Sequence, residues 1–152
     1  MRHALPVRGF TLIEMVTTLA IIAILVSIAV PSFVALMASQ GLETAASSLQ
    51  FALLTTRSEA LKRNTNVILA PNTPAQWNTG WTISGVSTGA SSGGPVPNIT
   101  ITGPATVTYQ GSGRLVSGSA SSVFKLSSPK TQDFRCVFIT LSGTPNIAST
   151  GC

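Results

Sequence analysis

The stretch Arg8-Gly9-Phe10-Thr11-Leu12-Ile13-Glu14 decides how this chain folds. It joins a basic leader to a long apolar segment, and from Phe10 to Ala38 the only ionisable side chain is Glu14. A helix needs about 20 apolar residues to cross the roughly 30 Å of hydrocarbon in a bilayer. The segment is therefore long enough to span a membrane. A charge at that depth costs about 2.5 kcal/mol or more, so Glu14 is expected to have a functional partner.

The residues around Glu14 resemble the class III signal of type IV pilins and of type II secretion pseudopilins. In those proteins a prepilin peptidase cuts after the glycine, and the new terminal phenylalanine is N-methylated. Carried onto this chain, the resemblance implies a leader of residues 1–9, cleavage between Gly9 and Phe10, and N-methylation of Phe10. It also implies that Glu14 meets the Phe10 amine of a neighbouring subunit during assembly. An amine with a pKa of about 7.7 to 8.0 is largely protonated at neutral pH, and pairing offsets the cost of desolvating both charges.

Two simpler interpretations, an ordinary secretory signal peptide and a plain membrane anchor, explain less of this segment. The apolar core of a signal peptide is about 7 to 15 residues long, and this run is about twice that length. A plain anchor explains the length but not the positions of Gly9 and Glu14 around Phe10. Arg2 and Arg8 place the leader in the cytoplasm by the positive-inside rule. We therefore expect a single-pass inner-membrane protein with a periplasmic C-terminal domain, which later joins a pilus or pseudopilus.

One long helix is predicted from about Thr11 to about Arg63. Residues 10–38 form its apolar part, which belongs in lipid or in a filament core, and Pro31 inside this part predicts a kink because it removes a helical hydrogen bond. Residues 39–64 form its amphipathic part, and Asn64 is expected to cap the helix. The apolar positions at helical spacing, expected to lie against a sheet, are Leu42, Ala45, Ala46, Leu49, Ala52, Leu53, Ala60 and Leu61.

Residues 65–152 are rich in Gly, Ser, Thr and Pro, with short β-type runs, and predict one β-rich globular domain. The fold class is therefore α+β, with a long N-terminal helix of the pilin type packed on a C-terminal antiparallel β-sheet domain. Residues 85–97 form a Gly- and Ser-rich loop that is expected to be mobile. The predicted strands are Val67 to Ala70, Gly80 to Ser84, Asn98 to Thr102, Ala105 to Tyr109, Ser122 to Leu126 and Phe134 to Leu141.

The two cysteines, Cys136 and Cys152, lie near the end of the chain. In an oxidising compartment a disulfide that closes a loop of this size contributes roughly 3 kcal/mol to stability. A metal site is the rival interpretation, but two cysteines without a nearby His or further Cys do not complete a tetrahedral site. We therefore expect a disulfide that fastens the C-terminus to the sheet, and no metal.

An enzyme is the first competing class of function. Gly85-Val86-Ser87-Thr88-Gly89 matches the nucleophile elbow G-x-S-x-G, but the motif needs a strand-turn-helix context and a His partner. The only histidine is His3, which leaves with the leader. We therefore expect no catalytic residues and no cofactor.

Loss of Arg2 and Arg8 with the leader lowers the formal charge from +5 to +3. A charge of this size does not by itself indicate that the protein binds nucleic acid.

Later parts of the chain resemble the GspH/FimT group of minor pilins and pseudopilins. Within this group, the Ala29-Val30-Pro31-Ser32-Phe33 segment and the C-terminal cysteine pair look more like type IV minor pilins of the FimT/FimU kind than like the type II secretion pseudopilin H. This resemblance implies a role in priming or capping pilus assembly, with other pilins, the prepilin peptidase and the inner membrane as partners. The residues that carry it are Arg57 to Asn64, Val67 to Leu69, Gly80-Trp81 and Gly113-Arg114.

DNA binding is the second competing class. Some FimT-like proteins act as DNA receptors in natural transformation, and a Gly-Arg-x-Arg element near their C-terminus contacts phosphates. The corresponding stretch here is Gly143-Thr144-Pro145-Asn146, which lacks both arginines and so neutralises no phosphate. The simpler interpretation of the remaining cations is a solvated helix face with scattered charges, and DNA binding is not favoured. The candidate DNA contacts, if these cations cluster in space, are Arg57, Lys62, Arg63 and Arg114.

Overall fold

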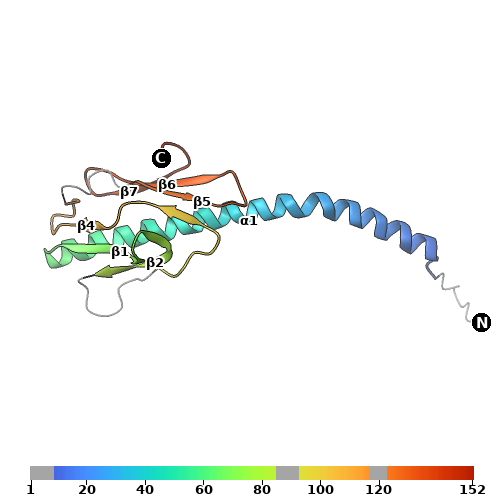
Figure 1. The fold of residues 1–152 in the computed structure, drawn as a ribbon, viewed down its shortest axis with the longest axis horizontal. Coiled ribbons are helices and arrows are strands. Elements are labelled where there is room, and N and C mark those ends of the chain that lie inside the picture. The colour runs from blue at the N-terminus through green and yellow to red at the C-terminus, as the bar shows by residue number, and fades with distance from the viewer. Residues whose placement is uncertain (1–8, 85–92, 117–122) are drawn as a thin grey trace, which may run out of the picture. The chain divides into compact units, whose positions relative to one another are not determined.

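The computed structural model describes residues 9–84, 93–116 and 123–152, and it divides into two compact units, Met1–Ala35 and Leu36–Cys152. One helix, α1, begins in the first unit and ends in the second, and every strand in the described residues lies in the second unit (Figure 1). The elements are α1 (Leu12–Arg63), β1 (Val67–Thr73), β2 (Gln76–Ser84), β3 (Thr100–Thr102), β4 (Val107–Tyr109), β5 (Val123–Ser127), β6 (Phe134–Ile139) and β7 (Pro145–Ala148).

α1 ends at Arg63, where the sequence predicted its end. Asn64 has a φ of 51°, the left-handed conformation that closes a helix. The Thr65 N–H then donates to the Ala60 carbonyl at 3.3 Å, which satisfies a carbonyl that the helix leaves free. The predicted cap at Asn64 is confirmed, and it turns the chain directly into β1.

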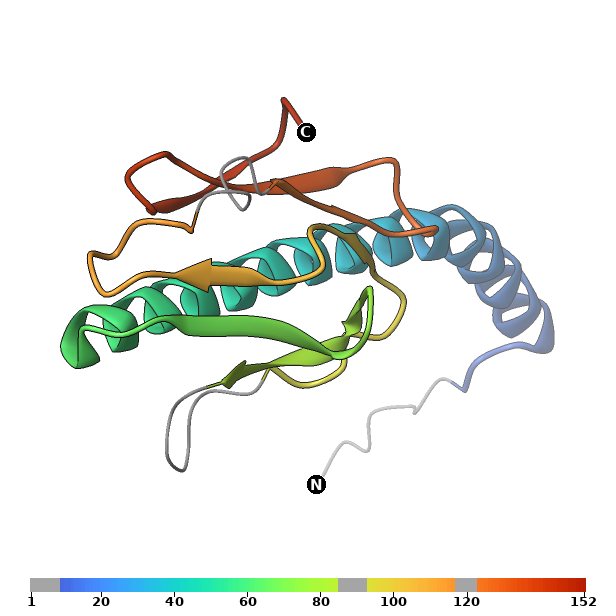
Figure 2. The ribbon, with the colours of Figure 1, turned by 60° about the vertical axis from the view of Figure 1, so that its left-hand side comes forward.

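The strands form two antiparallel sheets. Sheet A has the order β2-β1-β4, and sheet B has the order β3-β5-β6-β7. Both views show the strands beside the part of α1 that belongs to the second unit (Figures 1 and 2). The predicted α+β fold with antiparallel strands is confirmed, although the strands divide between two sheets.

The core fills the space between α1 and the sheets. Trp77, Trp81, Tyr109 and Phe124 are its largest buried side chains, and the Trp77 and Phe124 rings pack edge to face with centroids 4.9 Å apart. The predicted buried stripe of α1 is correct except at Leu61, whose side chain is 49% exposed. Thr56 is buried instead. Its hydroxyl donates a hydrogen bond to the Ala52 carbonyl at 2.7 Å, which compensates for the burial of this polar group.

Two local predictions were wrong. β7 was not predicted, because Pro145 and Asn146 are poor strand formers. Residues 93–96 of the supposedly mobile loop are held against β2: Gly93 and Trp81 exchange two backbone hydrogen bonds, and the Val96 N–H donates to the Asn78 carbonyl at 2.9 Å. Residues 85–92, which include the G-x-S-x-G match, lie outside the described residues.

Sheet B is tied to α1 by a row of polar contacts. The Ser39 hydroxyl donates to Asp133 Oδ2 at 2.6 Å, and the Arg135 guanidinium donates to Glu43 Oε2 at the same distance. Further along the helix, the Gln50 amide donates to the Pro145 carbonyl at 3.1 Å. We call this row, together with the contacts of Arg57 described below, the polar row of α1.

Candidate functional site

The start of α1 is a capping box. The Thr11 N–H donates to Glu14 Oε2 at 3.4 Å, and the Glu14 N–H donates to Thr11 Oγ1 at 3.3 Å, so each residue satisfies a donor that the first turn leaves free. The spacing Thr-x-x-Glu is present in the sequence. There, however, Glu14 was predicted to pair only with the Phe10 amine of a neighbouring subunit. The structure therefore gives Glu14 a partner within its own chain.

Gly9 and Phe10 lie before the helix and are exposed, Phe10 to 79%. A Cβ built on Gly9 would meet no atom within 4 Å among the described residues. The fold described here therefore does not require glycine at this position.

α1 is the one helix in the described residues that is long and apolar enough to cross a membrane, as judged by length and composition. Its most apolar 18-residue window has a mean hydropathy of 2.7, and none of that window is buried within the chain. Hydroxyl groups in this segment are satisfied inside the helix, since Thr17 donates to the Glu14 carbonyl and Ser27 to the Ile24 carbonyl. α1 continues through Pro31, and the kink there stays a prediction.

At the other end of α1, Arg57 joins the helix to two turns. Its Nε donates to the Gly113 carbonyl at 2.9 Å, one terminal nitrogen donates to the Ser142 carbonyl at 3.1 Å, and the other donates to Thr144 Oγ1 at 3.3 Å. The two turns touch, because a Cβ on Gly143, which has a φ of +83°, would lie 2.2 Å from the Gly113 carbonyl oxygen. Arg57 thus connects α1 to the turn that follows β4 and to the β6–β7 turn.

Tyr109 lies close to this connection. Its hydroxyl is buried without a hydrogen-bond partner in the described structure, and a Cβ on Gly143 would lie 3.2 Å from its ring. Burial raises the pKa of the Tyr109 phenol, and the charge of Arg57 partly opposes that shift. The phenol is therefore neutral at physiological pH.

The four candidate DNA contacts gather near the end of α1. The turn that carries Gly111, Gly113 and Arg114 packs on the helix: a Cβ on Gly111 would lie 2.6 Å from the Asn64 carbonyl carbon, and one on Gly113 would lie 3.0 Å from Leu61 Cδ2. This packing brings exposed Arg114 to the helix segment that carries Arg57, Lys62 and Arg63.

Two of these cations are partly neutralised. Lys62 Nζ lies 3.1 Å from Glu59 Oε1, and Arg63 Nε lies 3.2 Å from Glu59 Oε2. The hydrogen bond from Lys62, and then the one from Arg63, hold the pKa of the Glu59 carboxyl below its usual range. Arg57 is occupied by the turns, and Arg114 is exposed.

We expect Arg57→Ala to lower the free energy of unfolding of residues 36–152 by roughly 2 kcal/mol, because two carbonyls lose a charged donor. Lys62→Ala is a matched control five residues further along the helix. Its ion pair is exposed and is expected to contribute about 0.5 kcal/mol or less. Urea unfolding compares the two variants, and an equal effect would show that Arg57 does not hold the turns.

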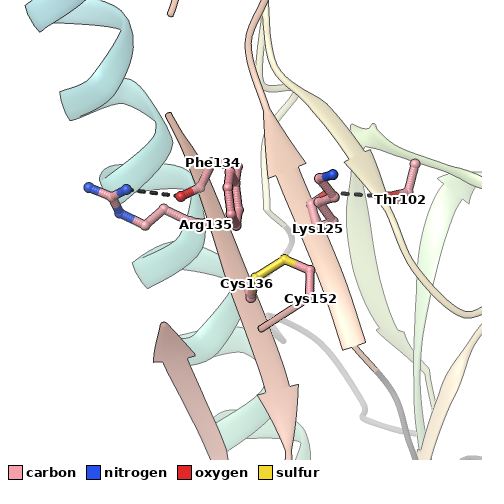
Figure 3. The surroundings of a disulfide bond; sticks show 6 residues. All are labelled: Thr102, Lys125, Phe134, Arg135, Cys136 and Cys152. Carbon is pink, nitrogen blue, oxygen red and sulfur yellow. Dashed lines mark hydrogen bonds between the residues drawn. A yellow bond between two sulfur atoms is a disulfide. The ribbon is translucent and has the colours of Figure 1, made fainter. Parts of the chain in front are cut away.

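Cys136 and Cys152 form a disulfide, as the sequence predicted, with Cα atoms 5.5 Å apart. Figure 3 shows the bond between β6 and the end of the chain, with Lys125 and Phe134 beside it. The Lys125 Nζ lies 5.4 Å from the centre of the Phe134 ring. Cys136 is fully buried. Two residues next to it are exposed: Lys125, which pairs with it between β5 and β6, and Cys152, to which it is bonded. The bond fastens the last residues to sheet B.

This arrangement, an apolar helix with a capped start followed by a disulfide-bonded β domain, defines a pilin-like protein. Residues 6–30 match the prokaryotic N-terminal methylation motif, and residues 45–144 match the family described as type II transport protein GspH. Because the second match covers more than half of the chain, the protein belongs to the GspH family, as a GspH/FimT-like pilin.

Two solved structures have a similar fold, both of the type IV minor pilin FimU of Pseudomonas aeruginosa in different crystal forms. The first is 21% identical, with a TM-score of 0.60 over 72% of this chain and 88% of the other. The second is 22% identical, with a TM-score of 0.57 over 70% of this chain and 92% of the other. No curated protein matches the chain by sequence. The long apolar helix and the methylation motif fit a membrane-anchored pilin.

Proposed function

We propose that this protein is a minor type IV pilin of the FimT/FimU kind, which joins a pilus through its N-terminal helix and helps to prime or cap its assembly. The observation that carries the proposal is the exposed apolar helix, with a methylation motif at its start, on a β domain that resembles FimU. Family and fold are those of structural proteins. The helix supplies the assembly contact, and the β domain supplies the exposed surface.

The proposal includes a sequence of locations. The leader of residues 1–9 stays in the cytoplasm, α1 crosses the inner membrane, and residues 65–152 fold in the periplasm, where the disulfide forms. Prepilin peptidase cuts after Gly9, and Phe10 is methylated. Glu14 then pairs with the Phe10 amine of a neighbouring pilin, which offsets the cost of the buried charge. No cofactor takes part.

Cell fractionation tests the proposal. Sheared pili from cells that express the chain at its natural level are expected to contain the mature form in small amounts, and deletion of the gene is expected to reduce piliation. The alternative is the type II secretion pseudopilin H, which the description of the family favours. Normal piliation with loss of protein secretion after deletion would support that alternative and contradict the proposal.

DNA binding is a further alternative, which the grouping of Arg57, Lys62, Arg63 and Arg114 near the end of α1 favours. The turn at residues 143–146 opposes it, because Thr144 and Asn146 are uncharged and supply no cation. Thr144 accepts a hydrogen bond from Arg57, and Asn146 in β7 pairs with Phe138 of β6. Ordinary non-specific binding has dissociation constants of about 10⁻⁴ to 10⁻⁶ M. We place this domain at or beyond the weak end of that range.

We expect residues 40–152 to bind duplex DNA no more tightly than about 10⁻⁴ M at physiological salt. Changing Thr144 and Asn146 together to Arg should tighten binding and steepen its salt dependence, because each new cation can neutralise a phosphate. Titrations at two salt concentrations measure both effects. Micromolar binding by the unchanged domain, lost when Lys62, Arg63 and Arg114 are replaced by Ala, would make DNA uptake the leading function.

A further inference from the structure

The turn between β5 and β6, residues 128–133, lies beside α1 at the point where the helix becomes polar. The Ser39 hydroxyl donates to Asp133 Oδ2, and the Arg135 guanidinium donates to Glu43 Oε2, both at 2.6 Å. Both views show this turn against the helix (Figures 1 and 2). Ser39 directly follows Ala38, the last residue of the apolar segment, and all of these residues belong to the second unit. The β5–β6 turn is therefore bonded to the helix where the apolar segment ends.

Hydrogen bonds within the β5–β6 turn fix its shape. The Thr131 N–H donates to the Ser128 carbonyl at 3.5 Å, which closes a β-turn with Pro129 at its second position, where proline is favoured. The Ser128 side chain is buried, and its hydroxyl accepts a hydrogen bond from the Lys130 N–H at 3.4 Å. The Asp133 N–H donates to Thr131 Oγ1 at 3.2 Å. Lys130, at the third position of the β-turn, thus lies at an exposed tip.

The Lys130 ammonium is free to bind an anion, because it has no ion-pair partner among the described residues. The charges next to it are engaged: Arg135 pairs with Glu43, and Asp133 accepts the hydrogen bond from Ser39. A lysine close to an anionic lipid surface gains about 1 kcal/mol from its attraction to the headgroups. The tip of the turn therefore has the chemistry to bind a phosphate.

The length of the apolar segment determines which layer of a bilayer this turn would meet. Residues 15–38 carry no ionisable side chain, and this run is longer than the about 20 residues that cross the hydrocarbon. The headgroup layers add about 10 to 15 Å to the roughly 30 Å of hydrocarbon. Leu36 and Met37, at the end of the run, are 54% and 52% exposed, so the β domain leaves them open to lipid. Ser39 and the turn bonded to it would therefore lie at the level of the headgroups.

We propose that the β5–β6 turn binds the headgroups of the bilayer that α1 spans, with the Lys130 ammonium on a lipid phosphate. This inference rests on the membrane anchor in the proposed function. The bonds from Ser39 and Glu43 hold the turn in place on the helix, so the lipid contact fixes the orientation of the β domain on the membrane. The contact must break when the protein leaves the membrane for a filament.

Photo-crosslinking of the full chain in nanodiscs of phosphatidylethanolamine and phosphatidylglycerol tests this inference. Benzoylphenylalanine in place of Gln132, an exposed residue of the β5–β6 turn, is expected to form lipid adducts that intact-mass spectrometry detects. The same group in place of Ser112 is the matched control and should form none. Ser112 is exposed in the turn after β4, which packs on the other end of α1 near Leu61. No adduct at position 132, or equal yields at both positions, would overturn the inference.

A charge variant gives a second measurement. Lys130→Ala is expected to lower the yield of lipid adducts at position 132 about fivefold, which corresponds to about 1 kcal/mol. Lys62→Ala, near the far end of α1, should leave the yield unchanged, and an unchanged yield in Lys130→Ala would contradict the role of the ammonium. If the chain enters nanodiscs but forms no adducts at position 132, this inference fails while the proposed function stands. If the chain does not enter nanodiscs, both fail.

Discussion

Gly9→Val is expected to leave the full-length precursor in the membrane, with no detectable mature form. A branched side chain at this position should not fit a peptidase pocket that takes a small residue. The fold gives no other reason for a loss, because the space around Gly9 is open among the described residues. Intact-mass spectrometry of membrane fractions distinguishes the precursor from a chain that begins at Phe10.

Gly9→Ala is the matched control for this prediction. The methyl group of alanine is the smallest side chain, so the precursor of this variant should still be cleaved, but at a reduced rate. A mature form that begins at Phe10 in the valine variant would contradict the assignment of the site. A wild-type N-terminus at any other residue would contradict it as well. Normal disulfide formation in both variants would show that the domain folds.

Glu14→Ala is expected to be processed normally and to enter pili at less than about one hundredth of the wild-type level, since an unpaired buried charge costs about 3 kcal/mol or more. In this variant the charge left unpaired is the Phe10 amine of the neighbour. Immunoblots of sheared pili and of membranes give the ratio. Incorporation at the wild-type level would show that the carboxylate is not used in docking.

The capping box makes a second variant informative. Glu14→Gln removes the charge but keeps a side chain that can accept the hydrogen bond from the Thr11 N–H. If charge pairing drives docking, Gln should be as defective as Ala. If the role of Glu14 is to cap its own helix, Gln should behave like wild type, and the proposed contact between subunits would be wrong.

The sequence was sufficient to predict α1, its cap at Asn64 and the disulfide, because these depend on local composition and on a single pair of cysteines. It was not sufficient to divide the strands between two sheets. β3 and β4 follow each other in the chain, yet β4 pairs with β1 and β3 pairs with β5. Such pairings depend on contacts between distant residues, which hydrophobic alternation does not specify.

The roles of some functional side chains could be predicted from the sequence and those of others could not, for a similar reason. Glu14 stood out because it is the only charge in an apolar segment. Arg57 was counted among the candidate DNA contacts, and its role in joining α1 to two turns depends on Gly113 and Gly143, which lie far away in the sequence. Glycines at such contacts have no distinctive pattern in a chain that is already rich in glycine.

The polar row of α1 also has a mechanical consequence. Ser39, Glu43, Gln50 and Arg57 are spaced by four, seven and seven residues, so they lie within about 40° of one another around the helix. A force directed along the helix would load these hydrogen bonds together in shear, so that none breaks alone. Inserting one residue between Glu43 and Gln50 would rotate the later contacts by about 100° and divide that load. The second unit is thus built to carry tension from its helix into sheet B.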